Sequence, residues 1–304
     1  MLNSTSKLLK IFPPEFAHSL TINILKYLNL RNNNFDDPIL SQHLFGLDFP
    51  NPIGLAAGFD KNAEIIKSMF SLGFGFVEVG TVTPMPQKGN PKPRVFRLKE
   101  DKAIINSLGF NNKGSKTVKQ NIIKYKKSSK ENKLIGVNIG KNKSSINSIN
   151  DYLLCMDELG SVANYITINI SSPNTEGLRD LQLRGNIEEL VKKINRKRES
   201  FDTINKKPIL IKISPDLNDD QLRDIALISL ANNVDGLIIT NSTIERQSTI
   251  KSQNKNKIGG LSGKPLFNKS NTILKKMYTL TNGQIPLIGV GGISTGSECY
   301  EKIK

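Results

Sequence analysis

The sequence predicts an α/β protein with the (β/α)8 TIM-barrel fold, and three observations lead to this fold class. Short apolar, β-branched runs alternate with amphipathic helical stretches along most of the 304 residues, as in a parallel sheet covered by helices. Seven such runs are visible, and polar side chains follow nearly all of them. A barrel assembles its site from the C-terminal ends of all its strands. A doubly wound sheet concentrates its site at one switch point, so the barrel fits better.

The seven expected strands are separated by stretches with helical periodicity. Residues 219–233, DDQLRDIALISLANN, form one expected helix, whose acidic first residues suit the positive end of a helix dipole. Two insertions interrupt the alternation of strands and helices. We expect residues 84–112 to form a hairpin with a loop, whereas residues 243–265 are polar and end in GGLSGKP. The expected strands cover residues 51–58, 75–81, 134–140, 165–171, 208–214, 236–242 and 286–292.

Polar or charged side chains stand at or just after the ends of the expected strands. Each of them alone would be interpreted as a cap or turn residue. In a barrel the C-terminal strand ends surround one pocket, so we expect these side chains to lie together. They are Lys61 after the first strand, Thr81, Asn138, Asn169 with Ser172, Lys212, and Thr240 with Asn241 at the end of the sixth.

The stretch YITINISSPNT, residues 165–175, allows two interpretations. Isoleucines alternate along its first part as in a buried strand, and five small, mostly polar residues follow. These residues either form an ordinary turn, in which Ser, Pro and Asn are common, or present a reactive surface. His18 and His43 both precede the first barrel-like strand. Acid–base chemistry in the main body must therefore use a side chain other than histidine.

Glycine-rich stretches indicate where a phosphate group would bind. GVGGIST, residues 289–295, allows backbone N–H groups to approach an anion closely, just before a helix that we expect to begin near Ser294. GGLSG, residues 259–263, precedes another expected helix start. One such turn is a weak signal, but two from neighbouring strands are what the phosphate of flavin mononucleotide (FMN) would use. Barrel enzymes frequently bind phosphate at the loops after the seventh and eighth strands.

The composition of the chain disfavours several classes of protein. The two cysteines, Cys155 and Cys299, show no paired spacing, which disfavours a disulfide framework and favours a reducing compartment. The formal charge of +16 comes from lysines spread along solvated-looking stretches, without a nucleic-acid motif, so attraction to an anionic membrane surface is at least as well supported as nucleic-acid binding. The sequence contains no run of about 18 apolar residues that would span a bilayer and no secretory leader pattern.

The N-terminal segment is expected to form two short apolar helices separated at Pro13 and Pro14. Two interpretations remain open: a helix that covers the barrel, or a hairpin on a membrane surface. We expect residues 1–45 to form this segment and residues 46–304 to form the barrel. The residues that recur every four positions on one face of the second helix are Phe16, Leu20, Ile24 and Leu28.

Nine motifs together resemble class 2 dihydroorotate dehydrogenase, the quinone-reducing flavoenzyme of pyrimidine synthesis. The resemblance runs from about residue 10 to residue 304. It implies FMN as cofactor, oxidation of dihydroorotate to orotate, and ubiquinone or menaquinone as electron acceptor. It also implies a monomer bound peripherally to the cytoplasmic side of the cell inner membrane, with no metal and no nucleic-acid partner. The motifs are GLAAGFDKN, EVGTVTPMPQKGNPKPRVFRL, INSLGFNNKG, GVNIGKNK, NISSPNTEGLR, IKISPD, TNST, GGLSGKPL and GVGGIS.

The same resemblance implies a role for individual residues. Ser172 would be the base that removes the C5 proton of dihydroorotate while a hydride leaves C6 for flavin N5, with Thr175 and an enclosed water as a relay. Lys212 would stabilise the anionic reduced flavin. The substrate site would comprise Lys61 at the carboxylate, Asn106, Asn174, Asn241 and Ser242 at the pyrimidine ring, and also Ser107, Leu108, Gly109, Phe110 and Asn169. The FMN site would comprise Ala57, Gly58, Phe59, Asp60, Lys61, Thr81, Asn138, Asn169, Lys212, Thr240, Gly263 and Gly292.

The resemblance also implies a membrane-surface hairpin through which the quinone reaches the flavin. Basic side chains of this segment would favour anionic lipid headgroups. They are Lys7, Lys10, Lys26 and Arg31.

The sequence departs from the family pattern at its C-terminal end. It stops at CYEKIK, in the expected helix after the seventh strand, whereas family members continue into an eighth strand with further phosphate contacts. We therefore expect either a short form or a relative with impaired flavin retention. Two alternatives follow: a catalytically inactive basic protein on a membrane surface, and a class 1 relative, which would lack the N-terminal hairpin. The visible spectrum of the purified protein separates the enzyme from the inactive protein.

Overall fold

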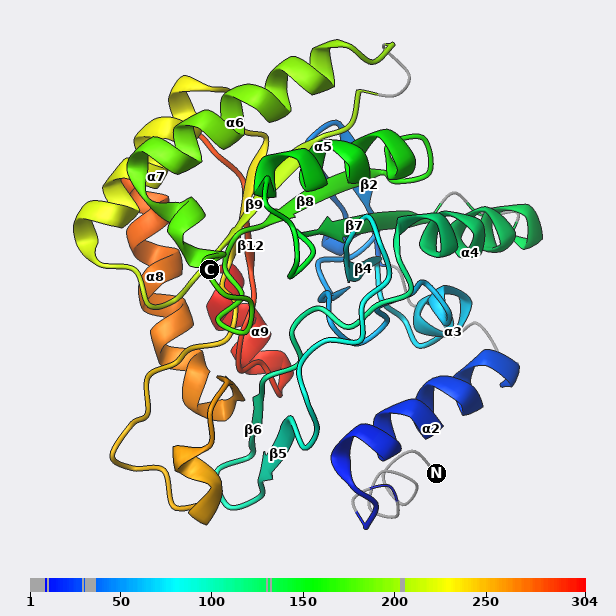
Figure 1. The fold of residues 1–304 in the computed structure, drawn as a ribbon, viewed down its shortest axis with the longest axis vertical. Coiled ribbons are helices and arrows are strands. Elements are labelled where there is room, and N and C mark those ends of the chain that lie inside the picture. The colour runs from blue at the N-terminus through cyan, green and yellow to red at the C-terminus, as the bar shows by residue number, and fades with distance from the viewer. Residues whose placement is uncertain are drawn as a thin grey trace.

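A sheet of seven parallel strands forms the centre of the molecule. The computed structural model describes residues 9, 11–28, 30, 37–129, 131, 133–202 and 206–304, and within them the sheet curls as part of a barrel wall, which confirms the predicted fold class (Figure 1). The strand order is β12-β10-β9-β8-β7-β4-β3. These strands are β3 (Gly54–Leu55), β4 (Phe76–Val82), β7 (Leu134–Ile139), β8 (Tyr165–Asn169), β9 (Ile209–Ile213), β10 (Gly236–Ile239) and β12 (Leu287–Gly289).

Helices follow the strands and cover the outer face of the sheet (Figure 1). The predicted helix at 219–233 is confirmed as α7, and Asn218 and Gln221 form a reciprocal capping box at its start. The helices after the barrel strands are α3 (Ile66–Ser71), α4 (Ser115–Ser128), α5 (Ser148–Leu159), α6 (Arg184–Glu199), α7 (Asp219–Ala231), α8 (Phe267–Leu280) and α9 (Gly296–Ile303). Short 3-10 turns are η1 (Pro38–Leu40), η2 (Arg179–Gln182), η3 (Gln253–Asn256) and η4 (Lys264–Leu266).

The main apolar core lies between the sheet and these helices. Ile166 and Ile168 of β8 are buried with Tyr152 and Met156 of α5 and Leu190 of α6. Burying one such side chain stabilises a fold by roughly 1.5–3 kcal/mol. Because helices and barrel interior cover both faces, the strands are nearly continuous apolar runs, which is the pattern that predicted them.

A small antiparallel hairpin closes the N-terminal end of the barrel. It consists of β1 (Gln42–Leu44) and β2 (Leu47–Phe49). The Phe49 ring meets the Phe76 ring edge to face, with 5.1 Å between centroids. Because this hairpin crosses the expected boundary between residues 45 and 46, we propose that the N-terminal segment ends before Gln42.

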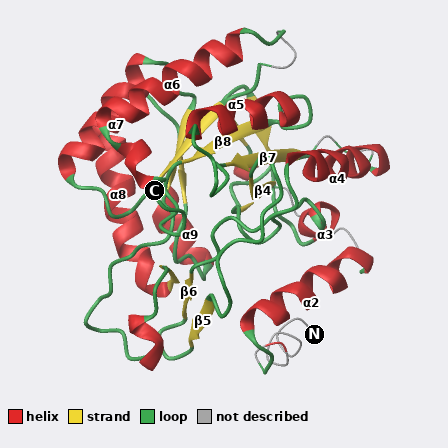
Figure 2. Cartoon of the chain, viewed as in Figure 1, coloured by secondary structure: helices red, strands yellow, loops and turns green. Residues whose placement is uncertain are grey.

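The two insertions form a second, three-stranded sheet apart from the barrel (Figure 2). The hairpin expected within residues 84–112 is confirmed as β5 (Val95–Leu98) and β6 (Ala103–Asn106). GGLSG, expected as a phosphate-binding loop, is instead largely strand β11 (Gly260–Gly263), antiparallel to β6. The reason is that β6, far away in sequence, offers β11 hydrogen-bond partners that a local pattern does not reveal.

The N-terminal helix α2 (Pro14–Tyr27) packs against the barrel and the second sheet. Ala17 and Ile22 are buried, whereas the predicted apolar stripe points outward, with Phe16 54% and Ile24 45% exposed. Most of the first predicted helix lies outside the described residues, and so do Lys7, Lys10 and Arg31. No helix in the described ranges is long and apolar enough to cross a membrane.

Candidate active site

A cavity of about 230 Å³ opens at the C-terminal ends of the barrel strands. Its walls come from the loops after β3, β8 and β10, from strands β4, β8 and β9, and from the second sheet with the loop that follows β6. Every residue of its lining belongs to the site predicted from the sequence. The lining consists of Ala57, Gly58, Lys61, Thr81, Asn106, Leu108, Gly109, Phe110, Asn169, Ser172, Asn174, Lys212, Asn241 and Ser242.

Ser172 is presented to the cavity by the loop that follows β8. Its side chain is buried, and its hydroxyl oxygen accepts a hydrogen bond from the Asn174 N–H at 3.3 Å. Pro173 restricts the backbone of the preceding residue to extended conformations. The amide of Asn174 donates to Asn106 Oδ1 at 3.2 Å, so a residue of the second sheet closes the cavity opposite the barrel.

The second sheet approaches this loop closely enough to require a glycine. Gly260 lies opposite Asn106 in the strand register. A Cβ atom added at Gly260 would lie 1.9 Å from Ser242 Oγ and 3.1 Å from Pro173 Cγ. The polar insertion therefore packs directly against residues of the site, although none of its own residues lines the cavity.

A chain of buried polar groups supports the cavity from inside the barrel. Asn169 Nδ2 donates to Thr81 Oγ1 at 2.9 Å and to Asn138 Oδ1 at 3.0 Å. Asn138 Nδ2 donates to Glu78 Oε1 at 2.9 Å, and Thr167 Oγ1 donates to Glu78 Oε2 at 2.8 Å. These hydrogen bonds orient the amides of the cavity floor. Glu78 is a residue of the site that was not predicted, although a carboxylate inside an apolar strand is a visible signal in FVEVGT.

Two lysines bring positive charge to the cavity. Lys212 on β9 is 5% exposed, and no described residue hydrogen-bonds its Nζ. Burial lowers the pKa of Lys212, and the negative charge of Glu78 opposes this. Lys61 Nζ donates to the Gly58 carbonyl. Burial lowers the pKa of Lys61 to about 8, against the opposing effect of Glu15.

Seven predicted residues do not line the cavity, and several of them have structural partners. The Asp60 carboxylate accepts hydrogen bonds from the backbone N–H groups of Glu64 and Ile65, at 2.8 and 2.9 Å. Asn138 lies behind the lining residues that it supports. The contacts of these seven residues with a cofactor or substrate stay predictions. The seven are Phe59, Asp60, Ser107, Asn138, Thr240, Gly263 and Gly292.

The two predicted phosphate-site glycines lie around the start of α8. Gly263 ends β11 directly before η4, with φ +101°. A Cβ atom at Gly292 would lie 2.7 Å from Phe267 Cα, at the first residue of α8. Both glycines therefore flank one helix start, although neither forms part of the cavity wall.

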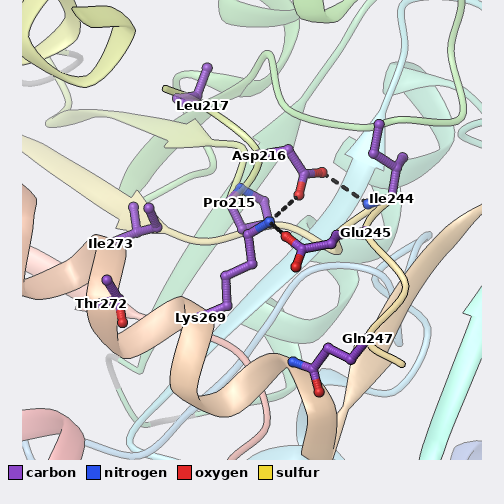
Figure 3. Close-up of a pocket in the computed structure, with 9 residues that line it drawn as sticks. All are labelled: Pro215, Asp216, Leu217, Ile244, Glu245, Gln247, Lys269, Thr272 and Ile273. Atoms are coloured by element: carbon purple, nitrogen blue, oxygen red, sulfur yellow. Dashed lines mark hydrogen bonds and ion pairs between the residues drawn. The ribbon is translucent and has the colours of Figure 1, made fainter. Parts of the chain in front are cut away.

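A larger cavity of about 440 Å³ lies at the loops after β9 and β10 (Figure 3). Lys269 Nζ donates to Asp216 Oδ1 at 2.9 Å and also pairs with Glu245. The charged groups that line this cavity therefore pair with one another, and none of the predicted site residues lines it. We place the candidate active site in the smaller cavity.

Comparisons with known proteins agree over nearly the whole chain. The family model described as dihydroorotate dehydrogenase matches residues 39–304. A dihydroorotate dehydrogenase (quinone) of Parvibaculum lavamentivorans is 46% identical over 298 residues, which are 98% of this chain and 83% of that protein. The mitochondrial dihydroorotate dehydrogenase (quinone) of Mus musculus is 42% identical, over 97% of this chain and 76% of the mouse protein.

A solved structure gives the same result for the fold. The crystal structure of dihydroorotate dehydrogenase from Eimeria tenella in complex with ferulenol superposes with a TM-score of 0.92 at 42% identity. The similarity covers 96% of this chain and 83% of that chain.

Proposed function

Because this chain belongs to the dihydroorotate dehydrogenase family, we propose that it oxidises dihydroorotate to orotate and passes the electrons to a quinone, in pyrimidine biosynthesis. One observation carries this function. Fourteen of the residues that the family motifs assign to substrate, base and flavin, which come from distant parts of the chain, line a single cavity.

We propose FMN as the cofactor. The supporting observation is the buried Lys212 ammonium, because a buried charge without a hydrogen-bond partner is costly and an anionic or oxygen-rich ring would provide that partner. Lys212 and the side chains of Thr81 and Asn169 would hold the flavin ring. When bound, FMN would supply a hydride acceptor for the substrate and a donor of electrons for the quinone.

Ser172 is the group placed to take the proton. A serine hydroxyl without a histidine is a weak base, so it needs a dry environment and a route for its own proton. Both features have support: Ser172 is buried, and Thr175 Oγ1 is a buried hydroxyl oxygen without a hydrogen-bond partner among the described residues. Thr175 would therefore relay the proton from Ser172 toward an enclosed water.

Lys61 and the asparagines would hold the substrate. The Lys61 ammonium suits the carboxylate of dihydroorotate as a charge-assisted partner. Asn106, Asn174 and Asn241 provide amides that both donate and accept, which matches a ring with alternating C=O and N–H groups. Ser242 adds a hydroxyl at the same wall.

Anaerobic titration with dihydroorotate tests the function and the role of Lys61 together. Dihydroorotate should bleach the flavin absorbance of the purified protein. The concentration for half bleaching should rise as the pH rises through about 8, because the pKa of Lys61 lies there and the neutral amine no longer pairs with the carboxylate. Lys61→Met should need more substrate at every pH and should lose this pH step. A coloured protein that dihydroorotate does not bleach would contradict the function.

We propose that α2 attaches the protein peripherally to the cytoplasmic side of the cell inner membrane and leads the quinone to the flavin. The support is its exposed apolar face, with Phe16, Ile24 and Leu28 all exposed, because an apolar helix face with basic neighbours binds at a membrane interface. We also propose that the protein acts as a monomer.

Ile24→Asp should weaken binding to anionic vesicles and the reduction of a long-tailed quinone by about tenfold or more, since one buried isoleucine contributes roughly 1.5–3 kcal/mol. Reduction of a small soluble dye should stay unchanged. Leu227→Asp, at an exposed leucine of α7, is the matched control and should change neither rate. Equal losses with quinone and dye would show that Ile24 acts through general stability.

A further inference from the structure

Arg179 connects three loops at the C-terminal end of the barrel. It opens η2, after the loop that carries Ser172. Its Nε donates to the Ser171 carbonyl oxygen at 3.1 Å, and its Nη2 donates to the Ser242 carbonyl oxygen at 3.2 Å. Its Nη1 donates to Asp216 Oδ2 at 3.0 Å. One planar guanidinium therefore holds the loops after β8, β9 and β10 together.

Asp216 fixes this guanidinium from the other side. Its carboxylate also accepts hydrogen bonds from the Ile244 N–H at 2.9 Å and from Lys269 Nζ (Figure 3). The Thr243 hydroxyl donates to the same carboxylate. Burial by itself would raise the pKa of Asp216, but these hydrogen bonds and the Lys269 charge hold it below its ordinary value. Asp216 thus stays ionised, and its side chain is 13% exposed.

The Arg179 contact with Ser171 restricts the reacting side chain through the backbone. The Ser171 carbonyl and the Ser172 nitrogen belong to one planar peptide unit, so holding the oxygen also orients the Ser172 backbone. Pro173 restricts the backbone of Ser172 from the other side. The hydroxyl of Ser172 is then left with rotation about χ1 as its main freedom.

We propose that Arg179, held by Asp216, is a positioning residue for Ser172 and Ser242 in dihydroorotate oxidation. This inference rests on the proposed function of the site. Arg179 does not line the cavity, so it acts through the peptides that it holds. A general base must lie within hydrogen-bond reach of the proton that it removes. Loosening these peptides should slow proton removal more than it weakens binding.

Arg179→Lys tests the proposal, because lysine keeps the charge but does not provide three donors in one plane. We expect the variant to retain flavin and to bind orotate within about threefold of the unchanged protein. The rate of flavin reduction at saturating dihydroorotate, measured in single turnover, should fall by about tenfold or more, within the range that a positioned base contributes. Arg184→Lys is the matched control, since Arg184 pairs with Asp224 on the outer helices and should change neither quantity.

A double-mutant cycle shows whether Arg179 acts through Ser172. In a Ser172→Ala background, Arg179→Lys should cause little further loss of the reduction rate, because groups that act as a unit are not additive. An equal fractional loss in both backgrounds would overturn the proposal. Weakened orotate binding with an unchanged saturated rate would also overturn it.

Asp216→Asn provides a second test that leaves the arginine in place, should Arg179→Lys fail to fold. It should show the same pattern on a smaller scale, with near-normal orotate affinity and a slower reduction step. A lower melting temperature with an unchanged reduction rate per bound flavin would assign the pair a purely structural role. Failure of the proposed function is separate, because in that case dihydroorotate would not reduce the flavin of the unchanged protein.

Discussion

Ser172→Ala should lower the rate at which dihydroorotate reduces the bound flavin by about 10²-fold or more, the usual contribution of a general base. Flavin occupancy and orotate affinity should stay close to normal, because the change removes one oxygen atom without altering the backbone. Stopped-flow spectroscopy of flavin bleaching at saturating dihydroorotate measures the rate. The visible spectrum and an orotate titration measure the other two quantities.

Ser171→Ala is the matched control for this variant. Ser171 is the neighbouring buried serine, and its hydroxyl donates to Asn169 Oδ1 at 3.0 Å instead of lining the cavity. Its loss should cost far less rate than the loss of Ser172. A near-normal rate in Ser172→Ala, or the same large loss in both variants, would rule out Ser172 as the base.

Lys212→Met should change flavin binding and protein stability in opposite directions. Without flavin, the variant should be more stable by about 1–3 kcal/mol, because it removes a buried charged group that has no hydrogen-bond partner among the described residues. Its affinity for flavin should fall by about 10- to 100-fold, since a hydrogen bond from a charged donor contributes roughly 1.5–3 kcal/mol. Denaturant unfolding of the flavin-free protein and a flavin titration measure the two effects.

The stability effect of Lys212→Met should also depend on pH. The pKa of Lys212 is lower in the folded protein than its ordinary value, so the folded state binds this proton less tightly than the unfolded chain does. The unchanged protein should therefore gain stability as the pH rises toward the ordinary lysine pKa, and the advantage of the variant should shrink. Lys275→Met, at an exposed lysine of α8, should show none of these effects. Unchanged flavin affinity in Lys212→Met would contradict the role of Lys212.

The barrel strands and the cavity were predictable because both depend on short-range patterns. Each expected strand contains an observed parallel strand or overlaps one, since strands buried on both faces must be continuous apolar runs. Ser172, Lys212 and Asn241 were predicted because the C-terminal ends of barrel strands surround one pocket. Their individual roles rested on the family resemblance, and those roles stay predictions.

Other parts of the site depended on contacts between distant segments. The pairing of β11 with β6 joins residues 260–263 to residues 103–106, and no local pattern in GGLSG indicates that pairing. Asn138 and Asp60 are polar residues of the predicted site, and the structure adds that their side chains bind other protein groups. Arg179 and Asp216 lie 37 positions apart in the sequence, so their joint hold on the loop of Ser172 appears only after folding.

The sequence by itself determined the parallel barrel, the strand ends that carry the site and the family of this protein. These features follow from the period of apolar residues and from motifs whose spacing is local. The tertiary structure decided which polar residues face the cavity, which support it from behind, how the second sheet closes it, and how Arg179 holds the loops around it. Such choices depend on hydrogen bonds between segments far apart in the chain, and a buried polar group takes whichever partner the folded packing brings within reach.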